Sequence, residues 1–300
     1  MKKLAIAFAT AVVLSACGAA SSADPATKAP ADQPASPTPP KSTTQVFAGR
    51  LDQALAGSWR SDTNKARDKY RHPKETLGFF GLKSGQTVIE ITPGGGWYTE
   101  ILAPLFKGQG KLVAAVVAPD TAINDGTKKY LTRTNGELRA KLAGDAEHFG
   151  DVEVREFATK GGSLGPDNSA DVVVTFRNVH NFLMWDADQA LFQSIFKVLK
   201  PGGVLGITDH RAAPGSDIAK IKETGYIPED YVIQLATQAG FKLDARSEIN
   251  ANAKDTKDYE GGVWTLPPTL SQKDKDKDKY LAIGESDRMT LRFVKPAAAK

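Results

Sequence analysis

The 300-residue sequence has one cysteine, a small excess of positive charge and no long apolar run. A single cysteine excludes an internal disulfide. Lys and Arg number 39 against 35 Asp and Glu, which gives no basis for nucleic-acid binding. With 41% hydrophobic and 25% charged residues, the composition is that of a globular protein. It excludes a disordered, collagen-like or polytopic membrane protein.

The first seventeen residues have the pattern of a secretion signal. Lys2 and Lys3 precede an apolar run at residues 4–14, which is too short to span a bilayer but suits the central region of a signal peptide. The run ends Leu-Ser-Ala-Cys, with the only cysteine at Cys17. This segment resembles the lipobox of bacterial lipoproteins. The resemblance implies cleavage after Ala16, lipid on Cys17, and an outer-membrane protein that faces the periplasm.

Residues 17–45 are rich in Ala, Ser, Thr and Pro and have almost no large apolar side chain. Such a segment cannot bury a core, so we expect a semi-extended tether behind the lipid. The composition becomes globular at about Val46, and residues 46–300 are predicted to form one domain. The membrane is therefore expected as a partner through the anchor alone.

Apolar segments alternate with amphipathic helical segments in this domain. Strands are predicted at residues 87–91, 112–117, 152–157, 171–176, 204–208, 241–248 and 289–294. Helices are predicted at residues 51–59, 73–80, 97–106, 125–142, 185–199 and 228–240. Helices between continuous apolar strands predict an α/β fold, doubly wound around a mostly parallel seven-stranded sheet with helices on both faces. The alternating charges of residues 273–279 predict a solvated loop.

A glycine-rich turn, Thr92-Pro93-Gly94-Gly95-Gly96, lies between the first strand and a helix. Glycines allow a tight turn and a close approach of the backbone to a ligand. The following helix start offers free N–H groups and the positive end of its dipole. Glu90, at the end of the strand, is placed to brace the turn or to reach a ligand amine, and Trp97 follows the turn.

The segment VIEITPGGGWYTEIL resembles the first motif of class I methyltransferases. Two further segments agree with that family: a strand followed by Arg177-Asn178-Val179-His180-Asn181, and the Leu-Lys-Pro-Gly-Gly turn that ends at Gly203. The resemblance covers about residues 70–296. In detail, the sequence is most similar to a group of predicted bacterial methyltransferases. It implies a Rossmann-like methyltransferase fold with S-adenosylmethionine as cofactor. The positions that it assigns to the cofactor are Glu90, Thr92, Gly94, Gly95, Gly96, Trp97, Val116, Phe157, Arg177 and Asn178.

The sequence departs from the family pattern at the second strand. Val116 stands where an acid usually holds the ribose hydroxyls, and the nearest carboxylate is Asp120. Phe157 ends the third strand without a following acid, and packing on the adenine ring is its implied role. Thr92 replaces the first glycine of the motif.

Three polar residues are candidates for catalysis. Strand order reverses between the first and fourth strands of such a fold, and ligands bind there. We therefore expect His180, Asp209 and His210 near one cleft. A histidine can take a proton from an acceptor hydroxyl or amine, and Asp209 can orient it. A metal site from these three residues is allowed by residue type, but no spacing signature supports one, and none is predicted.

These observations predict methyl transfer from S-adenosylmethionine to a small molecule. A binding or regulatory domain that kept the fold without the reaction stays open, because the ribose acid is missing and an envelope location separates the domain from the cytoplasmic source of the cofactor. A nicotinamide-dependent oxidoreductase is disfavoured. Its third motif glycine would fall at Thr99. No protein partner can be inferred.

Overall fold

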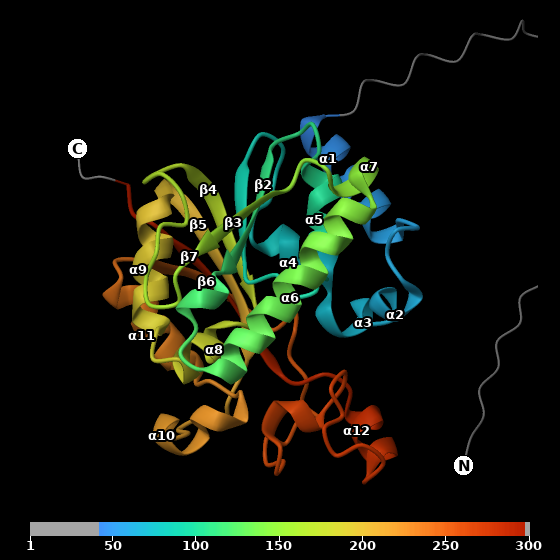
Figure 1. Ribbon diagram of the computed structural model, residues 1–300, viewed down its shortest axis with the longest axis vertical. Helices are drawn as coiled ribbons and strands as arrows, with labels where there is room; N and C mark the ends of the chain where they lie inside the picture. The colour runs from blue at the N-terminus through green and yellow to red at the C-terminus, as the bar shows by residue number, and fades with distance from the viewer. Residues whose placement is uncertain (1–41, 298–300) are drawn as a thin grey trace, which may run out of the picture. The chain divides into compact units, whose positions relative to one another are not determined.

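The computed structural model describes residues 42–297 (Figure 1). The predicted signal peptide, Cys17 and the tether up to residue 41 lie outside the described residues. The first helix begins three residues before the predicted domain boundary, at Thr43, because Ser42 and Gln45 form a reciprocal capping box. Among the described residues, no helix has the length and apolar character needed to cross a membrane.

Seven strands form one sheet in the order β3-β2-β1-β4-β5-β7-β6. Strands β1 to β5 pair in parallel, and β7 runs antiparallel to both β5 and β6. This order confirms the predicted doubly wound α/β fold and places the reversal of strand order between β1 and β4. The strands are β1 (Thr87–Ile91), β2 (Lys111–Val117), β3 (Glu153–Phe157), β4 (Ala170–Phe176), β5 (Leu199–His210), β6 (Lys242–Ser247) and β7 (Arg288–Val294).

Helices cover both faces of the sheet (Figure 1). The α-helices are α1 (Thr43–Ala56), α2 (Asp62–Lys65), α3 (Asp68–Arg71), α4 (Pro73–Phe79), α5 (Thr99–Phe106), α6 (Asp125–Gly144), α7 (Ala146–Phe149), α8 (Val179–Met184), α9 (Asp188–Val198), α10 (Ile218–Ile221), α11 (Glu229–Gln238) and α12 (Lys277–Ile283). Short 3-10 turns occur at Pro119–Thr121, Lys222–Thr224 and Gly262–Thr265.

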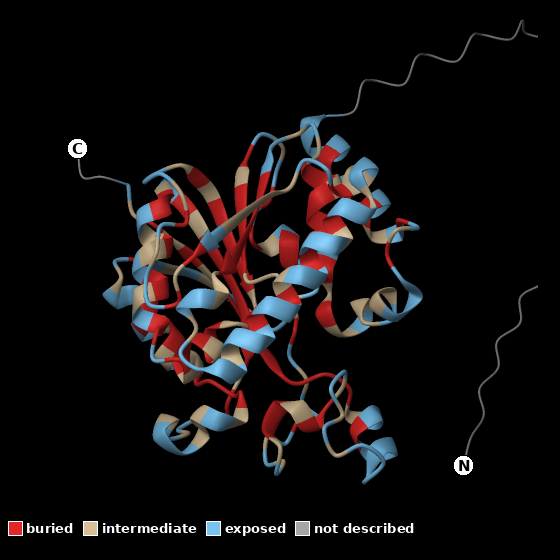
Figure 2. Cartoon of the chain, in the orientation of Figure 1, coloured by how far each residue is buried: buried red, intermediate tan, exposed pale blue. Residues whose placement is uncertain are grey.

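The central strands are buried on both faces (Figure 2). Alternate side chains of β1 enter two different apolar clusters: Val88 packs with α1, α4 and α5, whereas Ile89 and Ile91 pack with α8, α9 and α11. Glu90 shares the face of Val88, because successive side chains of a strand point to opposite faces. The alternation therefore directs this carboxyl toward α5.

The segment predicted as one helix at residues 185–199 is divided differently. Helix α8 precedes it, Asp186 adopts a left-handed φ of 50°, and α9 starts at Asp188. Strand β5 begins at Leu199 rather than at the predicted Val204. The strand therefore includes the Lys-Pro-Gly-Gly turn, in which Gly202 adopts a left-handed φ of 79°.

A long excursion, residues 248–287, connects β6 to β7. It contains Trp264, Glu285 and Ser286, all of which contact residues at the carboxyl ends of the parallel strands or the helices before β1. The charged stretch at residues 273–279 is mostly exposed, as expected, although α12 begins within it at Lys277. The excursion therefore adds side chains to the ligand-binding edge of the sheet.

Candidate functional site

The turn between β1 and α5 adopts left-handed backbone angles, with φ of 45° at Thr92, 58° at Gly94 and 80° at Gly96. A Cβ at Gly94 would meet no atom within 4 Å, whereas one at Gly96 would lie 3.1 Å from the Leu138 side chain of α6. Gly94 therefore leaves open space in front of the turn, and Gly96 allows α6 to pack against it.

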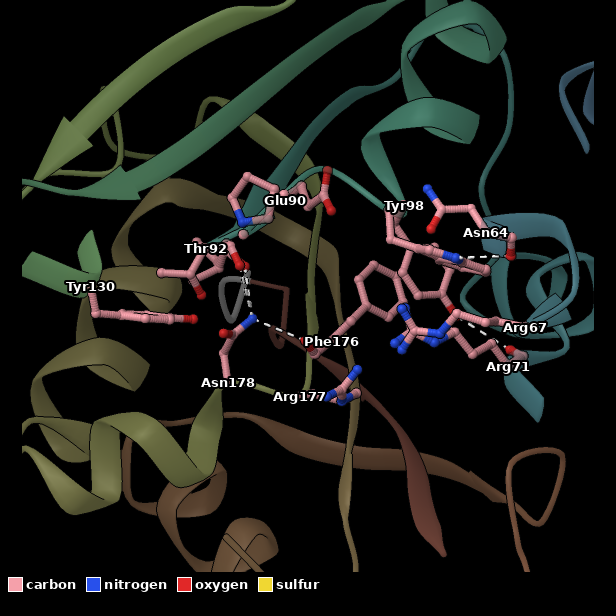
Figure 3. A pocket seen from close by; sticks show the side chains of 15 residues that line it. Asn64, Arg67, Arg71, Glu90, Thr92, Tyr98, Tyr130, Phe176, Arg177 and Asn178 are labelled. Atoms are coloured by element: carbon pink, nitrogen blue, oxygen red, sulfur yellow. Dashed lines mark hydrogen bonds between the residues drawn. The ribbon is translucent and has the colours of Figure 1, made fainter. Parts of the chain in front are cut away.

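A cavity of about 280 Å³, here called the first cavity, opens at this turn (Figure 3). Its lining includes seven residues that the sequence assigned to the cofactor: Glu90, Thr92, Gly94, Gly95, Trp97, Arg177 and Asn178. Gly96, Val116 and Phe157 are not among the lining residues. Val116 and Phe157 are 2% and 4% exposed and belong to the apolar clusters on opposite faces of the sheet. Their expected contacts with ribose and adenine are therefore not supported, because both side chains are used in the core.

Glu90 is a buried carboxyl in the wall of the first cavity. Its Oε2 accepts a hydrogen bond of 2.7 Å from the Thr99 hydroxyl. Burial raises the pKa of Glu90 to about 7, against the opposing effects of that hydrogen bond and of the Lys141 charge. Thr99 thus replaces the third glycine of a dinucleotide motif with a side chain that fixes the Glu90 carboxyl.

Asn178 joins the turns that follow β1 and β4. Its Nδ2 donates to the carbonyl oxygens of Ile91, Thr92 and Phe176 at 3.2, 3.1 and 3.0 Å (Figure 3). The carbonyls come from two neighbouring strands or their turns. Asn178 therefore holds the wall of the first cavity in place from both sides.

Trp97 lines the first cavity without closing it. Its Nε1 donates to the Asn64 carbonyl at 3.1 Å, which turns the indole toward the helices before β1. The Arg71 guanidinium carbon lies 4.5 Å from the Trp97 ring centroid. The neighbouring Tyr98 stacks on Phe176 with 3.5 Å between ring centroids. These contacts fix an aromatic wall beside the glycine turn.

A second cavity, of about 380 Å³, adjoins the first, since Tyr130, Arg177 and Asn178 line both. His180, His210 and Trp264 line the second cavity only. The structure therefore brings two of the three predicted catalytic residues to one space beside the cofactor candidates. The two volumes together reach the range of ordinary ligand sites, about 300–1,000 Å³.

Asp209 lies behind His180 and is fully buried. Its Oδ1 is 2.7 Å from His180 Nδ1, and its Oδ2 accepts the His180 backbone N–H at 3.2 Å. An ionised carboxylate accepts hydrogen bonds, so this pairing places a proton on Nδ1. His180 Nε2 makes no hydrogen bond within residues 42–297 and is left with a lone pair.

His210 is engaged at both ring nitrogens. Nδ1 contacts the Ser286 hydroxyl, and Nε2 accepts from Arg177 Nε at 3.3 Å. Burial, and next the positive charge of Arg177, lower the pKa of His210 well below its usual range. A neutral His210 that holds Arg177 is therefore a positioning residue in this arrangement.

His180, Asp209 and His210 offer possible metal ligand atoms within 4.8 Å of one another. Asp209 Oδ1 already accepts from His180 and from the His210 backbone N–H, at 2.7 and 2.8 Å. The Arg177 guanidinium occupies the lone pair of His210. A cation at this position would face that guanidinium, so the contacts favour a hydrogen-bonded group over a metal site.

Several lining residues are absent from the sequence-based assignment. They are Asn64, Arg67 and Arg71 from the segment of α2 and α3, Tyr98 beside the glycine turn, Tyr130 from α6, and Trp264 from the excursion. Arg67 and Arg71 are four residues apart, the spacing that aligns side chains on one helical face. That spacing was the available signal, but the sequence did not show what the face would contact.

Comparison with known proteins supports the predicted methyltransferase family. Residues 89–207 match the sequence model of the family described as "Methyltransferase domain". A phosphoethanolamine N-methyltransferase of Triticum aestivum is 33% identical over 221 residues, which are 71% of this chain and 38% of that enzyme. Residues 89–207 therefore have the sequence of a methyltransferase domain. This match supports the predicted S-adenosylmethionine-dependent methyltransferase family, and the chain spans 38% of the length of the Triticum aestivum relative.

Solved structures confirm the fold. The 4+2 cyclase SpnF superposes with a TM-score of 0.54 at 16% identity, over 85% of this chain and 97% of that one. A methyltransferase of Haloferax volcanii, solved with its Trm112 activator, gives a TM-score of 0.50 at 15% identity, over 82% and 97%. One of these structures is named a cyclase. At this level of identity the methyltransferase fold is shared, and activity must be argued from the site.

Proposed function

We propose that this protein transfers a methyl group from S-adenosylmethionine to a small-molecule acceptor. The observation that carries the proposal is the junction of two cavities at the point where strand order reverses. The first cavity lies at the glycine turn, and the second holds the His180–Asp209 pair. When bound, S-adenosylmethionine supplies an electrophilic methyl group on a sulfonium.

The described residues fit the amino-acid end of this cofactor. Glu90 offers a buried carboxyl for an ammonium group, and the backbone at Gly94 has open space in front of it. The Thr92 hydroxyl is buried without a partner in the described part of the chain, so a ligand can complete its hydrogen bonding. We assign these three residues to cofactor binding, together with Asn178 as the residue that holds the turn.

His180 is proposed as the base for the acceptor. Its Nδ1 is tied to Asp209 at 2.7 Å, which orients the ring and stabilises the imidazolium that forms on protonation. Nε2 can then accept the proton that an acceptor hydroxyl or amine loses. Alignment of the reacting groups supplies much of the rate in such a transfer, and Arg177 and Asn178 stand at the junction where the two ligands would meet.

Ligand titration tests the cofactor assignment. We expect S-adenosylmethionine and S-adenosylhomocysteine to bind the fragment from residue 42 onward, a compact unit, in calorimetry and thermal shift. Saturation at 100 times the dissociation constant should add about 2.7 kcal/mol of stability. NAD should produce no response. Failure of both sulfur ligands would favour the non-catalytic binding domain, for which the missing acid at the end of β2 is the specific observation.

We further propose that the protein is a lipoprotein of the bacterial envelope, anchored in the outer membrane through Cys17. The support is the sequence alone: a short apolar run that ends in Leu-Ser-Ala-Cys, followed by a proline-rich segment. A radiolabelled fatty acid should enter the full chain and partition with detergent. The Cys17→Ser variant should lose the label. Label retained in that variant would contradict the anchor.

A further inference from the structure

Three arginines contact one carboxylate beside the first cavity, and the charge of a fourth affects its pKa. Glu285 Oε1 lies 2.6 Å from Arg67 Nε, and Oε2 lies 3.1 Å from Arg71 Nε and 3.2 Å from Arg288 Nη2. Arg177 also acts on the charge of Glu285. The residues come from the segment before β1, the turn after β4, the excursion before β7 and the first residue of β7. Three guanidinium groups thus share the Glu285 carboxylate, and Arg177 lies among the same charges.

The terminal nitrogens of three of these arginines are free to bind a ligand. Glu285 takes the Nε of Arg67 and of Arg71, and His210 takes the Nε of Arg177. No described residue accepts from their Nη atoms, and Arg67 Nη2 is buried without a partner. All three residues line the first cavity, as Figure 3 shows. A guanidinium held at Nε presents a planar fork, the geometry that binds oxyanions.

Burial makes the unbalanced charge costly. Arg71 is 5% exposed, and burial and the neighbouring arginines lower its pKa, against the opposing effect of Glu285. Of the other carboxyl groups near this cluster, Asp209 is engaged by His180 and the backbone of His210, and Glu90 accepts from the Thr99 hydroxyl. A buried group of like charges is expected to bind a counter-ion. Here that ion must come from a ligand.

The cofactor alone does not supply enough negative charge. S-adenosylmethionine carries a sulfonium, an ammonium and a carboxylate, so its net charge is positive. Its carboxylate can compensate one arginine and its ammonium is assigned to Glu90, but its sulfonium adds to the excess of positive charge. We propose that the methyl acceptor carries an oxyanion, a carboxylate or a phosphate, which reaches from the second cavity past Arg177 into the first, where Arg67, Arg71 and Arg177 bind it. This inference rests on the proposed function and names the substrate class of the same site.

Titration of the full chain with simple anions tests the proposal. Inorganic phosphate and propionate represent the two sources of the oxyanion, and the tighter of the two identifies the acceptor group. At least one should bind saturably and raise the affinity for S-adenosylmethionine severalfold, because it offsets like charges. Failure of both to bind would overturn the proposal even if S-adenosylhomocysteine binds normally. Anion binding without binding of either sulfur ligand would instead contradict the proposed function.

Variants separate the acceptor from the cofactor carboxylate. Arg67→Gln should weaken binding of the preferred anion at least tenfold and leave S-adenosylhomocysteine affinity within twofold, since that ligand retains the cofactor carboxylate. Arg133→Gln, an exposed arginine of α6 paired with Glu137, is the matched control and should change neither. Arg71→Gln provides a second test if its melting temperature without ligand is retained. If Arg67→Gln instead weakened S-adenosylhomocysteine binding as much as anion binding, and the anion competed with S-adenosylhomocysteine, the arginines would belong to the cofactor site. That result would overturn the proposal.

Discussion

On the β1 and β4 side of the first cavity, the buried Glu90 carboxyl, the Thr92 hydroxyl, which has no partner among residues 42–297, and several arginines face the space. No residue of β2 or β3 is among its lining. Val116 and Phe157, which lie at or next to the carboxyl ends of those strands, are packed in the core. Asp120, the nearest acid after β2, points to solvent and pairs with Lys128. The contrast indicates that ligand affinity arises mainly at the reversal of strand order, and that the β2 side contributes little.

Gly94→Val, on the β1 and β4 side, should cause the largest loss of ligand affinity. A branched side chain would fill the open space in front of the turn at a backbone φ of 58°. The strain of about 1–2 kcal/mol is smaller than the stability of a typical domain, so the fold should persist. We expect S-adenosylhomocysteine binding in calorimetry to weaken by more than about 100-fold, equivalent to about 2.7 kcal/mol.

Gly136→Ala, on the exposed face of α6, is the control for this variant. Gly136 is not among the residues with positive φ, a Cβ there meets no atom within 4 Å, and the residue lines neither cavity. Its affinity should therefore stay close to that of the natural protein. Unchanged binding in Gly94→Val would move the ligand away from the glycine turn.

Asp209→Asn should have the next largest effect, on the rate rather than on cofactor binding. An amide at this position can hold the wrong tautomer of His180 and cannot stabilise its protonated form. Loss of a general base is worth about 10²- to 10⁴-fold, and kcat should fall within that range. The affinity for S-adenosylhomocysteine should stay within about threefold. A normal kcat, measured once an acceptor is found, would leave Asp209 a structural role only.

The β1 and β4 side was also the more predictable side from sequence. The strands and the glycine turn depend on local patterns: apolar runs of strand length and glycines at left-handed angles. Thr87–Ile91 was predicted with its exact bounds, and seven assigned residues line the cavity at that turn. Contacts within a strand–turn–helix unit are short in sequence, so their pattern is visible in the chain.

The arginine cluster could not be predicted, because its contacts are long-range. Arg67 and Glu285 are 218 residues apart in sequence, and Trp264 reaches the second cavity from an excursion with no regular pattern. The position of Val116 has a similar cause. Its assignment depends on its motif position, whereas the register of β2 directs its side chain into the core beneath α5 and α6.

Glu90→Gln should change how the stability and the cofactor affinity depend on pH. The pKa of Glu90 is raised from 4.5 to about 7 by burial, so the folded state binds the proton more tightly than the unfolded chain. The stabilisation from protonated Glu90 is complete below about pH 4.5 and is lost as the pH rises to about 7. At 1.36 kcal/mol per pKa unit, the natural protein should lose up to about 3 kcal/mol relative to the variant between pH 4 and 8.

Urea unfolding at pH 4, 6 and 8 checks this window. The free energy of unfolding of Glu90→Gln should lack the decrease seen in the natural protein. Binding should depend on pH in the opposite sense, since an ionised Glu90 attracts the cofactor's ammonium group. The natural protein should bind S-adenosylmethionine more tightly at pH 8 than at pH 6, and the variant should not. Parallel pH profiles for both proteins would separate Glu90 from the cofactor.

Asp120→Asn should have the smallest effect, and it tests the β2 side directly. Asp120 follows β2 where a ribose-binding acid would act, but its side chain is 88% exposed and lies 2.7 Å from the Lys128 ammonium. An exposed ion pair of this kind contributes little to stability. If the site depends on the β1 and β4 side, affinity for S-adenosylhomocysteine should remain within twofold in calorimetry. A tenfold loss would mean that the turn after β2 moves Asp120 onto the bound nucleoside, so that both sides of the cavity bind the ligand and the contrast holds only for the ligand-free protein.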